Sequence, residues 1–419
     1  MAAMDSQTAP APAARRTRLA VLVAVLGPGL LAGLSDDDPA GITTYSVVGA
    51  DYGYQLLWVL LLSTVALVLF HSLGARMGVA TGQGLIGLVR DRYGVRLGSL
   101  ALVLLLAANL GTACAEFAGV AAGFELFGVS REVSVPLAAG LVSVLVLRGS
   151  FHRVEHLLMA LAAVFVAYLA AGFVVGPDWG EVAAGLVVPS APLNRDALVV
   201  IVATVGTTLA PWGLSFIQSY AVDKKLTAAQ LPYERIDVIT GSVLTGVIGL
   251  FVVVTCAETL HASGVSIDSA ADAAGALEPL AGQGASALFG IGLIGAALLA
   301  AAILPLSTAY SVCEFTGHEG ALDDGFRGAP LFYSTFLLVT AAAAALVLIP
   351  SVPLVPLLVL TQVLNAVLLV PLLFFMYGLA RDPEQMGEHR ASRTEAVVYL
   401  VAIGLITLCV AALLVLTVA

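Results

Sequence analysis

Charged residues are scarce in this chain. Asp, Glu, Lys and Arg make up only 11% of its 419 residues, while hydrophobic residues make up 60%. Soluble domains contain about 25% charged residues. A soluble protein of this length has no single core large enough to bury so much apolar surface. Several apolar runs approach the roughly 20 residues that cross a bilayer as a helix. The composition therefore indicates a polytopic α-helical membrane protein.

Cysteine is also scarce, and the motifs of common enzymes are missing. The cysteines lie in apolar segments without CxxC spacing, at positions Cys114, Cys256, Cys313 and Cys409. This pattern argues against a disulfide framework or a thiolate metal cluster. The chain also lacks an HExxH motif, a phosphate-binding loop and a recognisable nucleophile–base constellation. We therefore expect no enzyme, no cofactor and no nucleic-acid partner.

The apolar runs form eleven candidate membrane spans that are separated by short polar loops. Their approximate ranges are 19–35 continued by 42–50, 54–75, 97–127, 133–149, 155–175, 197–222, 236–260, 284–314, 331–349, 354–379 and 395–418. No separate soluble domain is visible. Residues 1–14, which are rich in Ala and Pro, are expected to form a disordered tail. Residues 15–419 then form one transmembrane domain.

The distribution of Lys and Arg predicts the orientation, because cytoplasmic loops carry their excess. With the N-terminus inside, 16 of the 18 cationic residues fall on the cytoplasmic side, and only Arg131 and Arg195 fall outside. The first apolar run has no clear cleavage site, so we interpret it as a retained helix. We expect a monomeric, multi-pass protein of the plasma membrane, with a cytoplasmic N-terminus and an extracellular C-terminus.

Two spans are interrupted at matching places. Residues 35–41 of the first span read Ser-Asp-Asp-Asp-Pro-Ala-Gly, and residues 207–213 of the sixth read Thr-Thr-Leu-Ala-Pro-Trp-Gly. Proline and glycine interrupt a helix. Paired breaks five spans apart indicate an inverted-repeat transporter with its site at the membrane midplane. The repeats would cover about 19–175 and 197–380, with an added helix at 395–418. A loop before a re-entrant segment, or a simple kink at Pro211, are the alternatives.

The residues at these breaks indicate the kind of ligand. Three carboxylates at membrane depth are unfavourable unless they are paired, hydrated or bound to a cation. An amino-acid carrier of this architecture would instead offer helix N-termini to a carboxylate. Hard divalent ions take oxygen ligands. We therefore expect the Asp38 carboxylate and carbonyls freed at Thr207 or Ala210 to bind a divalent cation. Neither break contains sulfur, the soft ligand that favours transition metals.

Longer segments then resemble a known family. They are Gly27–Gly29 (Gly-Pro-Gly), Asp51–Trp58 (Asp-Tyr-Gly-Tyr-Gln-Leu-Leu-Trp), Arg76–Gly82 (Arg-Met-Gly-Val-Ala-Thr-Gly), His152–Glu155 (His-Arg-Val-Glu) and Leu360–Val363 (Leu-Thr-Gln-Val). Over most of its length the chain is similar to the Nramp family of divalent-metal transporters. The resemblance implies a LeuT-like fold of five plus five spans, with discontinuous helices 1 and 6 and a metal site between them.

The chain departs from the family at the metal site. The family motif Asp-Pro-Gly-Asn is Asp38-Pro39-Ala40-Gly41 here, so the Asp ligand is kept and Gly41 replaces the Asn ligand. The family motif Met-Pro-His is Ala210-Pro211-Trp212, so Ala210 replaces the metal-binding methionine. The family's carbonyl ligand maps to Thr207. Its glutamine in span 10 maps to Gln362, with Asn365 one turn further on the same face.

These departures resemble the magnesium-transporting branch of the Nramp-related proteins. Loss of the thioether removes a soft ligand, and the smaller residues are expected to enlarge the site. Mg²⁺ dehydrates reluctantly and usually keeps several waters. We expect a secondary transporter whose transported ion is Mg²⁺, and also Mn²⁺. The alternative is an ordinary proton-coupled Mn²⁺/Fe²⁺ transporter. A channel would differ from both by a flux that does not saturate.

A proton path needs titratable groups near the site. The sixth span contains no histidine, although the resemblance implies one. In span 3 the family has two acids one turn apart, and here only Glu116 remains. We therefore expect weak or absent proton coupling. Glu116 either bonds to a neighbouring helix as a neutral acid or lines the aqueous path. Asp37 either surrounds a hydrated metal or caps the restarted helix, and Asp36 is left open between these roles.

Overall fold

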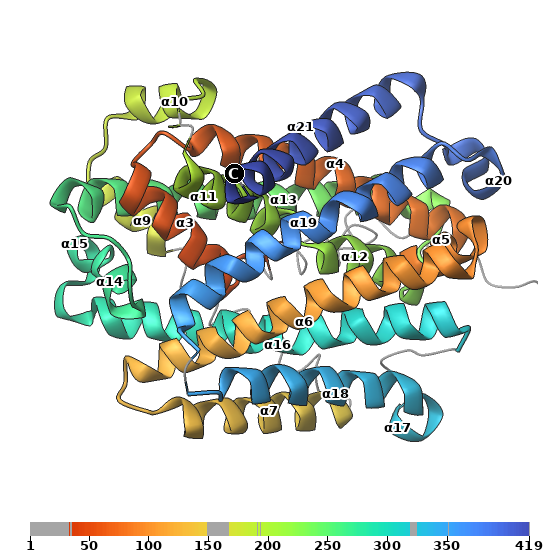
Figure 1. Ribbon diagram of the computed structural model, residues 1–419, viewed down its shortest axis with the longest axis horizontal. Helices are drawn as coiled ribbons and strands as arrows, with labels where there is room; N and C mark the ends of the chain where they lie inside the picture. The colour runs from red at the N-terminus through yellow and green to blue at the C-terminus, as the bar shows by residue number, and fades with distance from the viewer. Residues whose placement is uncertain are drawn as a thin grey trace, which may run out of the picture.

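The computed structural model describes residue 33 and residues 36–148, 167–190, 192, 194–318, 325–350 and 352–418. Its regular elements in these ranges are helices (Figure 1). The predicted tail at 1–14, the first half of span 1 and most of span 5 lie outside the described residues. So do two of the segments that carry the family resemblance, at 27–29 and 152–155.

The long helices follow the predicted spans closely. They are α3 (Pro39–Tyr52), α4 (Leu57–Thr81), α6 (Val95–Glu125), α7 (Arg131–Leu147), α9 (Ala167–Val174), α11 (Arg195–Thr208), α12 (Pro211–Asp223), α13 (Leu231–Thr259), α16 (Ala285–Thr316), α18 (Pro330–Val347), α19 (Leu354–Ala380) and α21 (Arg393–Val418). Shorter helices in the connections are α5 (Leu85–Tyr93), α10 (Trp179–Val187), α14 (Ala270–Gly275), α15 (Glu278–Ala281), α17 (Gly325–Gly328) and α20 (Pro383–Met386).

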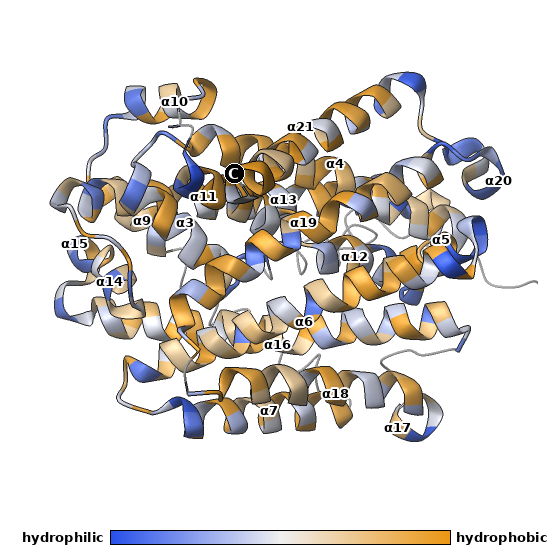
Figure 2. Ribbon diagram, in the orientation of Figure 1, coloured by the Kyte–Doolittle hydropathy of each residue, from blue (hydrophilic) through white to orange (hydrophobic). Residues whose placement is uncertain are grey.

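Within the described residues, eight helical segments are long and apolar enough to cross a membrane. The three remaining predicted spans coincide with α3, α7 and α9, which have 14, 17 and 8 residues. This arrangement is consistent with eleven spans. The outer helices present apolar side chains, for example Leu338 on α18 and Leu408 on α21, which are 71% and 65% exposed. In Figure 2 the ribbons of α18 and α21 are largely orange, the colour of hydrophobic residues, whereas hydrophilic residues gather at α5 and α20. Such a surface suits a hydrocarbon solvent.

Corresponding spans of the two predicted repeats pack against each other in pairs. The helices α3 and α11, α4 and α13, α6 and α16, and α7 and α18 are in contact. In Figure 1, α7 and α18 lie along one side, next to α6 and α16. The most apolar stretch of α11 and α12 is 94% buried, whereas that of α21 is 22% buried. The two broken helices therefore lie at the centre, and the added helix lies at the periphery.

Glycines set two of the closest helix contacts. A Cβ atom added to Gly206 of α11 would lie 1.9 Å from the carbonyl oxygen of Gln362 on α19. A Cβ atom on Gly119 of α6 would lie 2.3 Å from the ring of Pro39, the first residue of α3. Small residues let helix backbones approach in this way inside membranes. Both contacts hold a broken helix against its neighbour, so they fix the position of the breaks.

We expect Gly206→Ala to destabilise the protein by about 1–3 kcal/mol, because overpacking displaces backbone that has no space to move. The matched control is Gly140→Ala on α7, where an added Cβ meets nothing within 4 Å. Thermal unfolding of the two detergent-purified variants measures the difference. Equal midpoints would show that α11 and α19 do not pack as described.

Candidate functional site

The first break is built around Asp38. This residue is the N-cap of α3, and its Oδ1 accepts a hydrogen bond from the backbone N–H of Gly41 at 2.5 Å. Aspartate is a preferred N-cap residue, and proline is tolerated at the following position because it lacks an N–H. The local sequence therefore starts a new helix at Pro39. Asp36 and Asp37 lie in the chain just before it, and both are 2% exposed.

The second break separates α11 from α12. The hydrogen-bond ladder of α11 stops where Leu209 N–H bonds to the Val205 carbonyl at 2.9 Å. Ala210 is extended, with φ −66° and ψ 136°, and Pro211 begins α12. The last carbonyls of a helix have no partner within it. The end of α11, including the carbonyl of Thr207, therefore offers oxygen atoms to a ligand.

The two breaks meet at Gly41. A Cβ atom on Gly41 would lie 3.2 Å from Thr207 Oγ1 and 3.3 Å from Asp38 Oδ1. Thr207 Oγ1 is buried and has no hydrogen-bond partner in the described part of the chain. One turn further along α3, the Tyr45 hydroxyl lies 2.9 Å from Thr208 Oγ1, and the two hydroxyls form a hydrogen bond. The structure thus brings Asp38, Gly41 and Thr207 together.

Gly41 does not open a larger cavity in this conformation. A Cβ atom there would also lie 2.7 Å from the carbonyl oxygen of Asp36. The enlargement expected from replacing Asn with Gly is therefore not found at this position, because neighbouring backbone occupies the space. The Ala210 replacement acts differently, since it leaves the second break without sulfur. Ala210 is 3% exposed and carries no side-chain cap for α12.

Glu116 reaches the same centre from α6. It is fully buried, and its carboxyl lies within hydrogen-bonding reach of the Asp38 carboxyl. Its oxygens have no other hydrogen-bond partner among the described residues. Two carboxyl groups this close need a shared proton or an intervening cation. The sequence analysis left two roles open for Glu116, a bond to a neighbouring helix or a place on the aqueous path. The structure gives it a specific neighbour, the metal-ligand candidate Asp38.

Gln362 and Asn365 lie one turn apart on α19 and are hydrogen-bonded to each other. Asn365 Nδ2 lies 2.9 Å from Gln362 Oε1 and 2.8 Å from Thr112 Oγ1 on α6. The backbone of Gln362 contacts Gly206, the residue before Thr207. Gln362 is therefore beside the end of α11. Its side-chain oxygen is bonded to Asn365 rather than free in this conformation.

Asp37 adds charge to the centre. Both of its carboxylate oxygens are buried without a hydrogen-bond partner in the described ranges, and it interacts electrostatically with Asp36 and Asp38. Among the described residues, no three His, Cys, Asp or Glu side chains form a ready-made metal cage. Any ion held here would therefore take only a few protein ligands and complete its shell with main-chain oxygens and water.

His71 is a residue that the sequence analysis missed. It lies on α4, is 1% exposed, and its Nε2 has no hydrogen-bond partner in the described part of the protein. A Cβ atom on Gly213 would lie 3.1 Å from His71 Nε2 and 3.7 Å from Asp36 Oδ1. An available signal was its position inside an apolar span, since an ionisable residue at membrane depth is a functional candidate by default.

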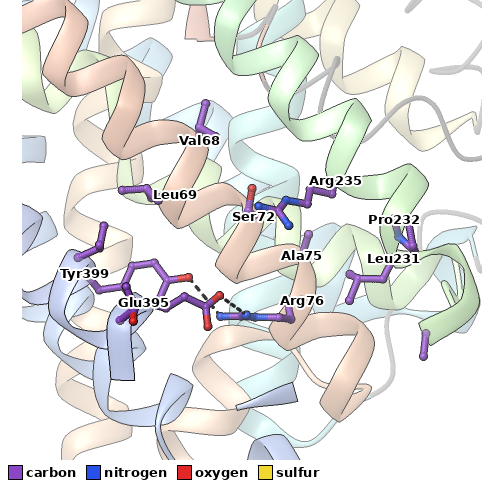
Figure 3. Close-up of a pocket in the computed structure, with 13 residues that line it drawn as sticks. Val68, Leu69, Ser72, Ala75, Arg76, Leu231, Pro232, Arg235, Glu395 and Tyr399 are labelled. Atoms are coloured by element: carbon purple, nitrogen blue, oxygen red, sulfur yellow. Dashed lines mark hydrogen bonds and ion pairs between the residues drawn. The ribbon is translucent and has the colours of Figure 1, made fainter. Parts of the chain in front are cut away.

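A separate cavity of about 570 Å³ lies between α4, α13 and α21 (Figure 3). In it, Arg76 forms an ion pair with Glu395 at 2.8 Å and a hydrogen bond with the Tyr399 hydroxyl at 3.2 Å. Arg235 points into the same space beside Ser72. None of the predicted site residues line this cavity. The bonds from Arg76 to Glu395 and Tyr399 attach α21 to α4. The cavity is distinct from the centre at Asp38.

Comparison with known proteins identifies the family. The chain matches the Nramp family, described as natural resistance-associated macrophage protein-like, over residues 29–416. This protein is a member of the Nramp family. The family resemblance carried by the sequence motifs is thereby confirmed. Nramp proteins are membrane transporters, so the expectation that the chain is not an enzyme is confirmed as well.

Similar Nramp proteins come from several bacteria. The chain is 30% identical to the divalent metal cation transporter MntH of Acidiphilium cryptum over 306 residues, which cover 70% of this chain and 69% of that protein. It is 33% identical to the divalent metal cation transporter MntH 1 of Pseudomonas aeruginosa over 311 residues, or 70% of each chain.

Solved structures confirm the LeuT-like fold class. The Eremococcus coleocola manganese transporter superimposes with a TM-score of 0.77 at 19% identity, covering 95% of this chain and 87% of that one. A nucleobase–cation symporter superimposes with a TM-score of 0.57 at 15% identity, covering 99% and 94%. Relative to the Nramp motifs, the described site keeps the aspartate and has Gly41, Ala210 and Trp212 where the family carries asparagine, methionine and histidine.

Proposed function

We propose that this Nramp protein transports divalent metal cations across the plasma membrane, with Mg²⁺ as its main substrate, Mn²⁺ as a second one, and no coupling to protons. The relatives named as divalent metal cation transporters support the general activity. The observation that carries the proposal is the junction of the two breaks. There, Asp38 and Thr207 lie next to Gly41, and Ala210 stands at the second break.

The ligand chemistry favours a hard ion. The junction offers carboxylate, hydroxyl and main-chain oxygens, which are the ligands that Mg²⁺ takes. A thioether, which would favour softer metals, is missing from both breaks. Because the protein supplies few ligands, the ion keeps part of its hydration shell. The carboxylates of Asp37 and Glu116 add negative charge around such a hydrated cation.

The proposed orientation has the N-terminus in the cytoplasm and the C-terminus outside. Figure 1 places α5, α17 and α20 at one end of the molecule and α14 and α15 at the other. The first end carries the basic residues of the connections, including Arg90, Arg92 and Arg327. An excess of such residues is typical of cytoplasmic loops. Both broken helices belong to one chain, so we propose a monomer as the transporting unit.

A proton-coupled Mn²⁺/Fe²⁺ transporter of the ordinary Nramp type is the second candidate, and two observations favour it. Glu116 lies within hydrogen-bonding reach of Asp38, and His71 lies near Asp36. Titratable groups therefore do stand beside the centre, although the histidine comes from α4 rather than from the sixth span. The structurally similar Eremococcus coleocola protein is a manganese transporter.

Asp38→Ala is expected to abolish saturable flux of Mg²⁺ and Mn²⁺, because it removes the carboxylate at which both breaks converge. The measurement is ion uptake into proteoliposomes with Mg²⁺, Mn²⁺ and Ca²⁺ supplied separately. Glu132→Gln, which changes an exposed acid at the start of α7, serves as the control and should transport like the wild type. Saturable flux that persists in Asp38→Ala would overturn the proposed site.

Ala210→Met should shift the preference of the site toward softer ions. A thioether at this position is expected to tighten Cd²⁺ or Mn²⁺ binding relative to Mg²⁺ by roughly tenfold, or about 1.4 kcal/mol. Ala210→Leu is the matched control, since it adds similar volume without sulfur. Competition of Mg²⁺ against Mn²⁺ uptake reports the change. The same shift in the leucine variant would mean that size, rather than sulfur, controls selectivity.

Transport without proton coupling predicts that Mg²⁺ influx leaves the vesicle interior at constant pH. A pH-sensitive dye trapped inside proteoliposomes measures this directly during uptake. An ionophore that clamps the membrane potential removes the driving force for passive proton leakage, so any change in internal pH comes from the transporter. Acidification that follows metal influx in the wild type and disappears in Glu116→Gln would establish the second candidate instead.

A further inference from the structure

His71 and Asp36 face one common point although they come from different segments. That point is the position of a Cβ atom on Gly213, which would lie 3.1 Å from His71 Nε2 and 3.7 Å from Asp36 Oδ1. His71 belongs to α4, Gly213 to α12, and Asp36 precedes the first break. Because residue 213 is glycine, α12 places no side chain at this point, where a Cβ atom would already lie closer to the imidazole than in an ordinary van der Waals contact.

Both polar groups lack the partners that burial requires. His71 is 1% exposed and Asp36 is 2% exposed. His71 Nε2 and both carboxylate oxygens of Asp36 have no hydrogen-bond partner in the residues that the structure describes. A buried polar atom left without a hydrogen-bond partner destabilises a protein, and a charged one does so more strongly. An occupant that bonds to both groups would remove this penalty.

The point lies to one side of the Asp38 centre. Gly213 follows Ala210 by three residues, which corresponds to a rise of about 4.5 Å along α12. Asp36 precedes Asp38 by two residues, on the side of the first break away from α3. Asp36 and Gly213 thus both belong to the segments that lie across the breaks from α3 and α11.

We propose that Asp36, His71 and the gap over Gly213 form a second cation subsite, which receives a hydrated divalent cation as it moves between Asp38 and the end of α12. The inference rests on the proposed transport of divalent cations and adds a second position for the ion. The Asp36 carboxylate balances the charge of the cation. The neutral imidazole accepts a hydrogen bond at Nε2 from a water molecule in the coordination shell of the ion, so the ion stays hydrated.

Mn²⁺ is a suitable probe because it is paramagnetic and resembles Mg²⁺ in its oxygen ligands. In purified Asp38→Ala protein, the main site is lost and the subsite is kept. We expect this variant still to bind Mn²⁺, more weakly than the wild type, with a weak nitrogen coupling from His71 in pulsed electron paramagnetic resonance. Adding His71→Leu should remove the nitrogen coupling. His71→Gln, which retains an acceptor, should keep Mn²⁺ binding while losing that coupling.

Gly213→Ala tests the gap directly, because it places a methyl group at the common point. We expect the maximal rate of metal uptake to fall by about tenfold, a factor that corresponds to 1.4 kcal/mol. Gly140→Ala, which introduces the same substitution in open space, should transport like the wild type. Thermal unfolding and gel filtration establish that each variant is folded before it is compared.

Two results would overturn the subsite: an Asp38→Ala protein that is folded but binds no Mn²⁺, or Mn²⁺ bound there without any nitrogen coupling to His71. Equal uptake by Gly213→Ala and Gly140→Ala would also overturn it. These outcomes are separate from a failure of the proposed function. If the wild type carries Mn²⁺ but no Mg²⁺, the assignment of the main substrate fails, while the nitrogen coupling and the Gly213→Ala defect still support the subsite.

Discussion

A group of buried carboxyls inside a membrane is the constraint on which this structure depends. Asp36, Asp37, Asp38 and Glu116 are each at most 4% exposed, and most of their oxygens lack hydrogen-bond partners within the described chain. Carboxylates at this depth are tolerated only with protons, water or cations around them. The broken helices supply the other half of the arrangement, because they bring main-chain oxygens and a helix N-terminus to the same place. A divalent ion is the simplest partner for so many acids.

The paired packing of the two repeats explains how such a centre is held in place. Four helices of the first repeat, α3, α4, α6 and α7, contact their counterparts α11, α13, α16 and α18 in the second. Gly119 against Pro39 and Gly206 against Gln362 permit backbone contacts that larger residues would prevent. The Asn365–Thr112 hydrogen bond joins α19 to α6 beside the same centre. These close contacts and this hydrogen bond hold the helices around the acids in place.

Much of this arrangement is readable from the sequence, because hydrophobic length and helix-breaking residues are local signals. The spans, both breaks and the shared face of Gln362 and Asn365 follow from such signals. The cap of the restarted helix does not: that role was considered for Asp37 and Asp36, and the structure gives it to Asp38. The approach of Glu116 to Asp38 does not follow from them either, since it depends on how α6 packs against α3. The surroundings of Gly41 also depend on tertiary packing. A glycine in place of asparagine predicts a larger site, but the backbone of Asp36 occupies that space. His71 was overlooked because histidines were sought on the sixth span, where the family has one.

The hydrogen bond between Tyr45 and Thr208 has a consequence for motion. It ties α3 to α11, the two half-helices that lie on the same side of the breaks. A hydrogen bond of this kind contributes about 0.5–1.5 kcal/mol to stability. The coupling free energy through which a bound ligand shifts a conformational equilibrium is of similar size. The bond thus stabilises, by a modest amount, the conformation in which α3 and α11 are in contact. Conformations that separate α3 from α11 must break this hydrogen bond, and a cation bound at the proposed site between Asp38 and Thr207 would favour the conformation in which the bond is formed.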